Sequence, residues 1–241
     1  MPDTRTHRGA HPEDTELFSP SHVPSLQIAT AELCWLLDRG YALRSSLALT
    51  GDRHRLTERQ RLAVKRCVCS RDQRNRRAEH EIDVPRLRGR ALWIDGYNLL
   101  ITVEAALGGG IVLVGRDRCC RDMSSLHGSY REVAETVRAA ELIGEACERS
   151  GVAYCRWLLD RPVGNSGRLK SLLTEIAVQR GWSWDVDLEF SPDQILSTTF
   201  EIIASSDSLV LDRCDSWFNL ARTLITGNVP HAAMIELTGE A

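Results

Sequence analysis

The amino-acid sequence predicts an α/β protein in which a mainly parallel sheet is flanked by helices and preceded by a small all-helical N-terminal domain. Helical spacing without strand signals fills the first third of the chain, whereas beyond residue 90 short apolar runs alternate with amphipathic helical segments. This alternation is typical of a parallel sheet with helices on its faces. With 241 residues, of which 43% are hydrophobic and 26% charged, the chain is long enough to form one large domain or two modest ones.

The sequence divides into four segments. The first contains several prolines and no apolar periodicity, so we expect a disordered tail. In the second, apolar residues recur at helical spacing from Leu26 to Leu37, and Thr57–Gln60 has the pattern of a capping box that opens a further helix. The third is polar and rich in arginine. The expected tail, helical domain, basic linker and α/β domain are residues 1–24, 25–70, 71–90 and 91–241.

Strand and helix signals alternate through the α/β domain. Ala91–Asp95 is a short apolar run that ends in Asp-Gly, as a buried parallel strand does, and a glycine triplet marks the turn before the next strand. Ser191 and Pro192 are placed to open a short helix. The expected strands are residues 91–95, 107–114, 152–159, 182–188, 201–204 and 232–237. The other expected helices are residues 130–149, 165–180 and 216–224.

Positive charge is concentrated in one part of the chain. Residues 53–90 contain thirteen Arg and Lys against five Asp and Glu, a local net charge of +8, whereas the whole chain carries −3. A cationic segment joined to an acidic domain suits a protein that holds a polyanion beside a carboxylate-lined site. The alternative is a solvated helix face followed by a linker.

Cysteine usage and hydropathy indicate the compartment. The eight cysteines form no C-x-x-C pair and no zinc-finger spacing, so we expect reduced core thiols, with the adjacent pair Cys119–Cys120 as an exception to watch. No apolar run approaches the roughly 20 residues of a membrane helix, and the N-terminus lacks the apolar region of a secretory signal. We therefore expect a cytoplasmic protein without a membrane partner.

Four acidic residues are placed for metal binding. Asp95, Asp160 and Asp207 lie at or just after the ends of predicted strands, and Asp193 lies in the first turn of the short helix. The carboxyl ends of parallel strands meet at one edge of a sheet, so these side chains are expected to converge. Converging carboxylates repel one another unless a cation neutralises them, and Mg²⁺ or Mn²⁺ fits oxygen ligands. Taken singly, each acid is also explained by turn, ion-pair or helix-cap chemistry.

The segment Ile94–Leu100 resembles the opening strand and turn of the NYN branch of the PIN-like nucleases. In that family an Asp-Gly-Tyr-Asn turn presents the first metal-binding Asp, and further acids follow a second strand, begin a later helix and end another strand in a Ser-Asp pair. The segments of this chain that match in that order are Leu158–Asp160, Pro192–Leu196 and Ala204–Ser208. The resemblance covers roughly residues 91–212 and implies a PIN-like metal-dependent nuclease.

The whole chain also resembles a bacterial and archaeal family known as domain of unknown function 434. That family joins a helical part with a Leu-x-x-Arg-Gln-Arg-like segment, here Leu56–Arg61, to a domain that contains IDGYN. This resemblance supports the fold and implies no activity. Residues 101–129 depart from the simple NYN pattern as an insertion, in which Asp117 and Asp122 are either additional site acids or part of a solvated hairpin.

A loop after Asp160 has the composition of a phosphate site. It contains two glycines, Ser166 and Arg168, and runs into a predicted helix, whose N-terminal N–H groups would suit a phosphate. A plain turn and helix cap is the alternative. Tyr97, beside the expected carboxylates, is the aromatic residue best placed to stack on a base.

These observations support two main hypotheses of different classes. The first is a metal-dependent ribonuclease or related phosphodiesterase in which Asp95, Asp160, Asp193 and Asp207 bind Mg²⁺ or Mn²⁺. In that hypothesis Asn98 orients water or substrate, and the expected substrate-binding residues are Tyr97, Ser166, Arg168 and Ser206. The second is a nucleic-acid or nucleotide binding module that keeps the fold but does not cleave. The expected partner is nucleic acid, RNA rather than DNA, and homo-oligomer formation is left open.

A third hypothesis is a phosphotransfer enzyme with Asp95 as the nucleophile. That class usually carries a second Asp two residues further on, where this chain has Tyr97. We therefore rank it below the other two.

Overall fold

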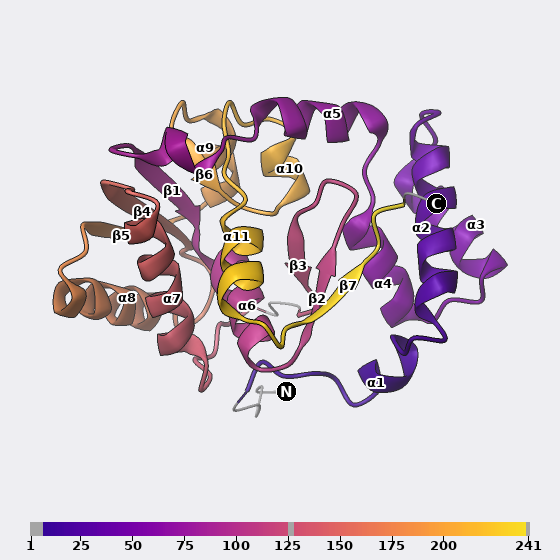
Figure 1. The fold of residues 1–241 in the computed structure, drawn as a ribbon, viewed down its shortest axis with the longest axis horizontal. Coiled ribbons are helices and arrows are strands. Elements are labelled where there is room, and N and C mark those ends of the chain that lie inside the picture. The colour runs from indigo at the N-terminus through magenta and orange to yellow at the C-terminus, as the bar shows by residue number, and fades with distance from the viewer. Residues whose placement is uncertain (1–6, 125–127, 240–241) are drawn as a thin grey trace.

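The computed structural model describes residues 7–124 and 128–239, and its larger sheet is four-stranded and parallel and lies on the left in Figure 1. The strand order is β5-β4-β1-β6, so that β1 pairs with β4 on one side and with β6 on the other. The fold class predicted from the sequence is confirmed. The four strands are β1 (Ala91–Asp95), β4 (Tyr154–Asp160), β5 (Trp184–Glu189) and β6 (Ile202–Ala204).

Helices cover both faces of this sheet because its strands are apolar on both sides. Along β1, Leu92 and Ile94 join the main hydrophobic core, whereas Trp93 between them packs against a second cluster that includes Leu196 and Trp217. This alternation follows from the two-residue period of a strand. The surrounding helices are α6 (Gly96–Leu107), α7 (Thr136–Arg149), α8 (Ser166–Arg180), α9 (Pro192–Thr198), α10 (Ser208–Leu211) and α11 (Leu220–Asn228).

A second sheet, which the sequence analysis did not separate from the first, lies between the main sheet and the N-terminal helices (Figure 1). It consists of β2 (Ile111–Val114), β3 (Cys120–Asp122) and β7 (Ala233–Glu236), with β2 parallel to β7 and antiparallel to β3. Ile111 and Leu113 face the helical core, whereas Val112 and Val114 face the main core. The 101–129 range expected as an insertion therefore supplies the end of α6 and two strands.

The N-terminal region is all-helical, as predicted. Thr57 and Gln60 form the expected capping box at the start of α4, and Ser70 and Gln73 form a second one at the start of α5. The expected linker over 71–90 therefore contains a helix. The helices are α1 (Asp14–Leu17), α2 (Val23–Leu37), α3 (Leu43–Arg53), α4 (Glu58–Cys67) and α5 (Arg71–His80), followed by the 3₁₀ turn η1 (Val84–Leu87).

The described part of the expected disordered tail is packed against the rest of the protein. Arg8 is buried, and its Nε donates to Glu104 at 3.0 Å. Asp14 in α1 is buried as well and accepts two hydrogen bonds from Arg59. These ion pairs, which join residues far apart in sequence, explain why composition alone predicted a tail. Residues 1–6 of that range lie outside the described part of the chain.

The cysteines and the helices can be compared with the expectations from the sequence. All eight cysteines are buried and free, and burial raises the pKa of Cys120 to about 11, so this thiol stays protonated at neutral pH. Among the described helices, none has the length and apolar character needed to cross a membrane.

Candidate functional site

The carboxyl edge of the main sheet holds the predicted site. Asp95 is the last residue of β1, Asp160 is the last residue of β4, and Asp207 follows β6 as the N-cap of α10. Helix α6 begins directly at Gly96, where an added Cβ would lie 2.5 Å from Leu159 Cδ2 and 2.9 Å from the Leu158 carbonyl oxygen. The tight strand-to-helix turn after Asp95 therefore requires glycine.

Asp95 is a buried carboxyl group in an acidic environment. Its exposed fraction is 6%, and its Oδ2 accepts a hydrogen bond of 2.7 Å from Ser205 Oγ. Burial, and after it the negative charges of Asp193, Asp207 and Asp160, raise the pKa of Asp95 to about 7 against the lowering effect of the Ser205 hydrogen bond. A buried carboxyl group among other carboxylates is costly to ionise, which is a feature of functional sites.

The other predicted acids share this electrostatic environment. Partial burial raises the pKa of Asp160. The pKa of Asp193 is raised by desolvation and then by the charges of Asp207 and Asp160. The structure thus brings the four acids within electrostatic reach of one another. In residues 7–124 and 128–239, however, no three His, Cys, Asp or Glu side chains form a group that could hold a metal ion.

A set of short hydrogen bonds fixes the loop that carries Asp207. The Oδ1 of Asn98 accepts from both the backbone N–H and the hydroxyl of Ser206, each at 2.8 Å. Ser205 Oγ, which donates to Asp95, accepts from the Asp207 N–H at 3.0 Å. Ser205, which the sequence analysis did not select, therefore links two of the predicted acids. Ser205 could have been identified from the sequence by its position in the Ser-Ser-Asp run directly after a strand.

Tyr97 lies beside the acids with an unsatisfied hydroxyl group. The residue is 4% exposed, and its hydroxyl oxygen has no hydrogen-bond partner among the described residues. Burial raises the pKa of Tyr97, and the charge of Asp160 raises it further. Its ring packs on Tyr130 with the centroids 5.4 Å apart. A buried polar group without a partner costs about 1–3 kcal/mol, so this hydroxyl is a candidate contact for a ligand.

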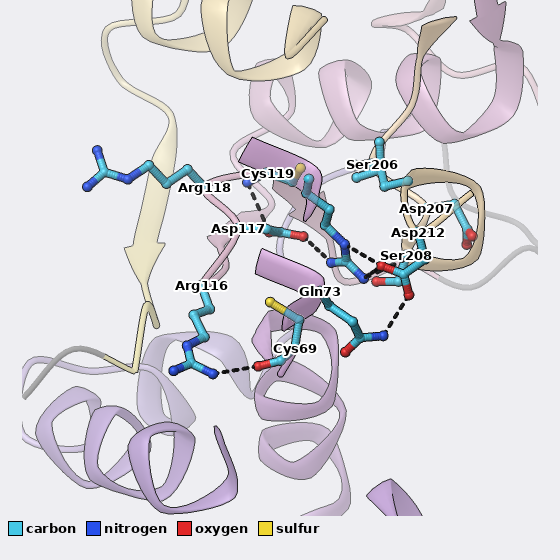
Figure 2. A network of polar contacts seen from close by, with 12 residues as sticks. Cys69, Gln73, Arg116, Asp117, Arg118, Cys119, Ser206, Asp207, Ser208 and Asp212 are labelled. Atoms are coloured by element: carbon cyan, nitrogen blue, oxygen red, sulfur yellow. Dashed lines mark hydrogen bonds and ion pairs between the residues drawn. The ribbon is translucent and has the colours of Figure 1, made fainter. Parts of the chain in front are cut away.

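A buried network of ion pairs supports the same loop from below (Figure 2). Asp117 accepts from Arg121 Nη1 at 2.9 Å and Nη2 at 2.6 Å, and from Arg77 Nη1. Arg121 Nε in turn donates to the Ser206 carbonyl oxygen at 2.8 Å, and Arg77 pairs with Asp212 at 2.7 Å. Burial opposes the ionisation of Asp117, but the adjacent Arg121 and Arg77 charges hold its pKa well below its usual range.

This network corrects the interpretation of Asp117. The sequence left two interpretations open, a site acid or part of a solvated hairpin, whereas Asp117 is buried as the partner of two arginines. No local pattern indicates this role, because Arg77 is 40 residues away from Asp117 in sequence. Asp122 differs from it, since its carboxylate accepts from Thr102 Oγ1 at 3.1 Å and from the Ser124 N–H.

A cleft of about 910 Å³ is lined by Asp207, one of the four predicted acids. One wall comes from the N-terminal helical region and includes Tyr41 and Lys65. The other wall comes from the sheet edge and includes Asn98, Ser206 and Asp207. The predicted site therefore borders a space large enough for a small-molecule or nucleotide ligand.

The predicted phosphate loop lies apart from this cleft. Arg168 lines a separate cavity of about 160 Å³ together with Tyr130 and Asn165. Ser166 is buried at the start of α8, and its hydroxyl donates to the Arg161 carbonyl oxygen. Asn165 has a φ of 70°, and its amide donates to the Tyr130 carbonyl oxygen at 2.9 Å. These contacts are those of a turn and helix start.

Much of the basic segment is used inside the protein. Several of its arginines form ion pairs that hold the helices together, and α5 buries Arg77 beneath the site loop. Its charge is therefore less available to a polyanion than composition indicates. These ion pairs join Arg59 to Asp14, Arg61 to Asp52, Arg66 to Asp122, and Arg77 to Asp117 and Asp212.

Comparison with known proteins divides the chain into two matched regions. The family model described as "Protein of unknown function (DUF434)" matches residues 25–80, and the model described as "Domain of unknown function (DUF5616)" matches residues 84–223. The expected resemblance of the whole chain to the first family therefore holds for the helical region alone. An uncharacterised protein of Methanocaldococcus jannaschii is 24% identical over 188 residues, which cover 78% of this chain and 89% of that protein. No solved structure matches the chain. The larger match spans more than half of the sequence and contains the sheet edge with its acids, and the chain belongs to the DUF5616 family.

Proposed function

We propose that the protein is a Mg²⁺- or Mn²⁺-dependent phosphodiesterase that cleaves RNA. The observation that carries the proposal is the environment of Asp95, whose pKa is raised to about 7 by burial and by three other carboxylates from separate elements. Its hydrogen-bond partner is the Ser205 hydroxyl and not a cation. Stability alone does not favour such a group, so a role in binding or catalysis is the better explanation.

The donor chemistry of the site fits a hard divalent cation. The available side chains are carboxylates, and Mg²⁺ typically binds one or two carboxylates, several waters and a substrate phosphate. A cage of three protein ligands is therefore not required, which accords with its absence among the described residues. Asp95 would hold the cation with Asp193 or Asp207, whose charges are the two largest carboxylate contributions to its pKa. When bound, the cation would polarise a phosphodiester oxygen and lower the pKa of a water molecule.

The remaining residues would position substrate and water. Both hydrogen bonds from Ser206 end on Asn98 Oδ1, which leaves the Asn98 amide nitrogen as a donor for a phosphate oxygen or water. The buried Tyr97 hydroxyl would donate in the same way. The charge of Asp160 raises the pKa of Tyr97. When its carboxyl group is ionised, Asp160 would accept a proton from the attacking water.

The likeness of Ile94–Leu100 to the NYN branch of the PIN-like nucleases supports the same activity. Along the chain, the matched acids end β1, end β4, lie in the first turn of α9 and follow β6, which is the order expected for that family. This likeness is part of the proposal, since neither matched family model names an activity.

A non-cleaving nucleic-acid binding module is the second candidate. The observation in its favour is that no three potential ligands group together in the part of the chain that the structure describes. A module of this kind would use the cleft and the loop contacts of Asn98 without needing a cation. Isothermal titration of the full chain with Mg²⁺ and Mn²⁺ separates the candidates, because the nuclease must bind metal and the module need not.

Cleavage of a labelled single-stranded RNA in the presence of Mg²⁺ or Mn²⁺ tests the proposal. We expect cleavage by the wild-type protein, its loss in Asp95→Asn, and its retention in Asp52→Asn, a matched change at an exposed acid of α3. Circular dichroism establishes that both variants are folded. Undiminished cleavage by Asp95→Asn, or cleavage that persists in excess chelator, would contradict the assignment. A matched DNA strand tests the expected preference for RNA.

A further inference from the structure

We propose that the cleft between the N-terminal helices and the sheet edge binds the nucleotides of a single strand that flank the reacting phosphodiester. The ligand rests on the proposed function, but the far wall of the cleft, which includes Tyr41 and Lys65, is built by residues that take no part in the proposed chemistry. The helical region would thus supply a substrate-binding wall to the α/β part.

The cleft reaches the carboxylate site at Asp207. Asn98, Ser206 and Asp207 line it, and the same residues make the hydrogen bonds that fix the site loop. From there it extends over α5 to α4 and to the turn between α2 and α3. A strand with a phosphodiester at Asp95 and Asp207 therefore has the cleft as an adjoining path.

The far wall carries the groups that recognise a nucleotide. Tyr41 lies in the turn between α2 and α3, is 58% exposed and lines the cleft, as does the exposed Leu209 at the opposite rim. Lys65 on α4 is exposed and has no ion-pair partner within residues 7–124 and 128–239. An exposed aromatic ring next to an unpaired cation suits a base and its phosphate, since bases stack on aromatic rings and cations track the backbone.

The other charged groups of the cleft are already neutralised by protein partners. Arg77 and Arg121 are held by the buried Asp117, and Asp212 is paired with Arg77. Asp122 lies 3.7 Å from Arg66, an ion pair that occupies both side chains. The charge left for a ligand is therefore that of Lys65 at one end and of the carboxylate site at the other. This arrangement fits a strand whose reacting phosphate lies at the acids and whose flanking phosphate lies at Lys65.

The hydroxyl group of Tyr97, to which the proposed function gives a donor role, is a second indication that the cleft receives a ligand. This residue lines the cleft, is 4% exposed, and has a hydroxyl oxygen with no hydrogen-bond partner in the described structure. A ligand oxygen that accepts from this hydroxyl would satisfy it. Tyr97 thus lines the cleft and also lies close enough to Asp160 for that carboxylate to raise its pKa.

Binding of a fluorescein-labelled short single-stranded RNA to the full chain tests the inference. Fluorescence anisotropy is measured in chelator, so that metal-dependent cleavage does not interfere, and at several salt concentrations. We expect Tyr41→Ala to weaken binding about five-fold or more, as loss of one stacked base does. We expect Lys65→Ala to weaken binding and to reduce the slope of log K against log salt by about 0.7, the value for one phosphate of a single strand.

Control residues are available in the helical region outside the cleft. Trp35 is 54% exposed and Arg53 is largely exposed, and both line a separate groove on α2 and α3. Trp35→Ala and Arg53→Ala should bind as the wild type does. An abasic strand of the same length should bind the wild type more weakly than RNA does, and Tyr41→Ala should remove that difference.

The outcomes separate this inference from the proposed activity. If Tyr41→Ala and Lys65→Ala bind as tightly as the wild type, or if the wild type does not bind the strand, the inference is wrong, whether or not the protein cleaves RNA. If these variants lose binding while the controls keep it, the inference holds, even when Asp95→Asn proves to have no effect on cleavage.

Discussion

The raised pKa of Asp95 predicts that removing its charge will stabilise the metal-free protein in a pH-dependent way. An aspartate in an unfolded chain has a pKa of about 3.9, whereas burial and the neighbouring carboxylates raise the pKa of Asp95 to about 7. At about 1.36 kcal/mol per pKa unit, this difference corresponds to about 4 kcal/mol of stability. Asp95→Asn removes the charge and keeps an oxygen that can accept from Ser205.

The raised pKa of Asp95 determines how the stability of the wild type changes with pH. Below about pH 4 the carboxyl group is protonated in both states and the wild type carries no penalty. As the pH rises to about 7, the unfolded chain releases the proton more readily than the folded protein, so stability falls, and the full penalty is present above pH 7. Linkage therefore predicts that the free energy of unfolding of Asp95→Asn exceeds that of the wild type by about 1.5 kcal/mol at pH 5 and by about 4 kcal/mol at pH 8.

Urea unfolding at the two pH values, in the presence of chelator, measures this difference. Asp52→Asn serves as the control, because Asp52 is an exposed acid far from the sheet edge. We expect the advantage of Asp95→Asn to widen by about 2.5 kcal/mol between pH 5 and pH 8. An advantage that does not change with pH, or a variant less stable than the wild type at pH 8, would refute the reasoning.

Three further predictions concern the same edge of the sheet. Mg²⁺ or Mn²⁺ at pH 8 should raise the thermal midpoint of the wild type but not of Asp95→Asn, since a cation that binds only the folded state stabilises it. An equal rise of the midpoint in both proteins would place the cation elsewhere. Asp117→Asn should lower the free energy of unfolding measured in urea by about 3–5 kcal/mol, because it leaves Arg77 and Arg121 buried without their shared partner. A decrease below about 1 kcal/mol would contradict the role of Asp117 as that partner. Gly96→Ala should cost about 1–3 kcal/mol, since the added Cβ meets the Leu158 carbonyl oxygen at 2.9 Å, and an unchanged urea midpoint would show that the turn has room.

The sequence predicted the sheet edge because local signals identify it. Each of Asp95 and Asp160 ends a short apolar run, and parallel strands with helical connections place such ends on one side of a sheet. The capping signals at Thr57 and Ser191 are likewise local. These features need no knowledge of which strands pair, so they could be read from the chain alone.

Long-range pairing accounts for what the sequence analysis missed. Ile111–Val114 has the apolar character of a core strand, and nothing in its pattern shows that it pairs with the distant Ala233–Glu236 in a second sheet. Helix α5 is polar on nearly all sides and buries Arg77 instead of an apolar stripe, so periodicity did not identify it. Its capping box at Ser70 and Gln73 was the local signal that could have found it.

Anomalous X-ray diffraction from crystals soaked in Mn²⁺ tests the central claim most directly. Asp95 and one of Asp193 or Asp207 are proposed to hold one cation at the carboxyl edge of the sheet. The account predicts an anomalous peak about 2 Å from a carboxylate oxygen of Asp95 and from one of Asp193 or Asp207. A fully soaked crystal with no peak at this edge, or with Mn²⁺ bound only at other side chains, would contradict it.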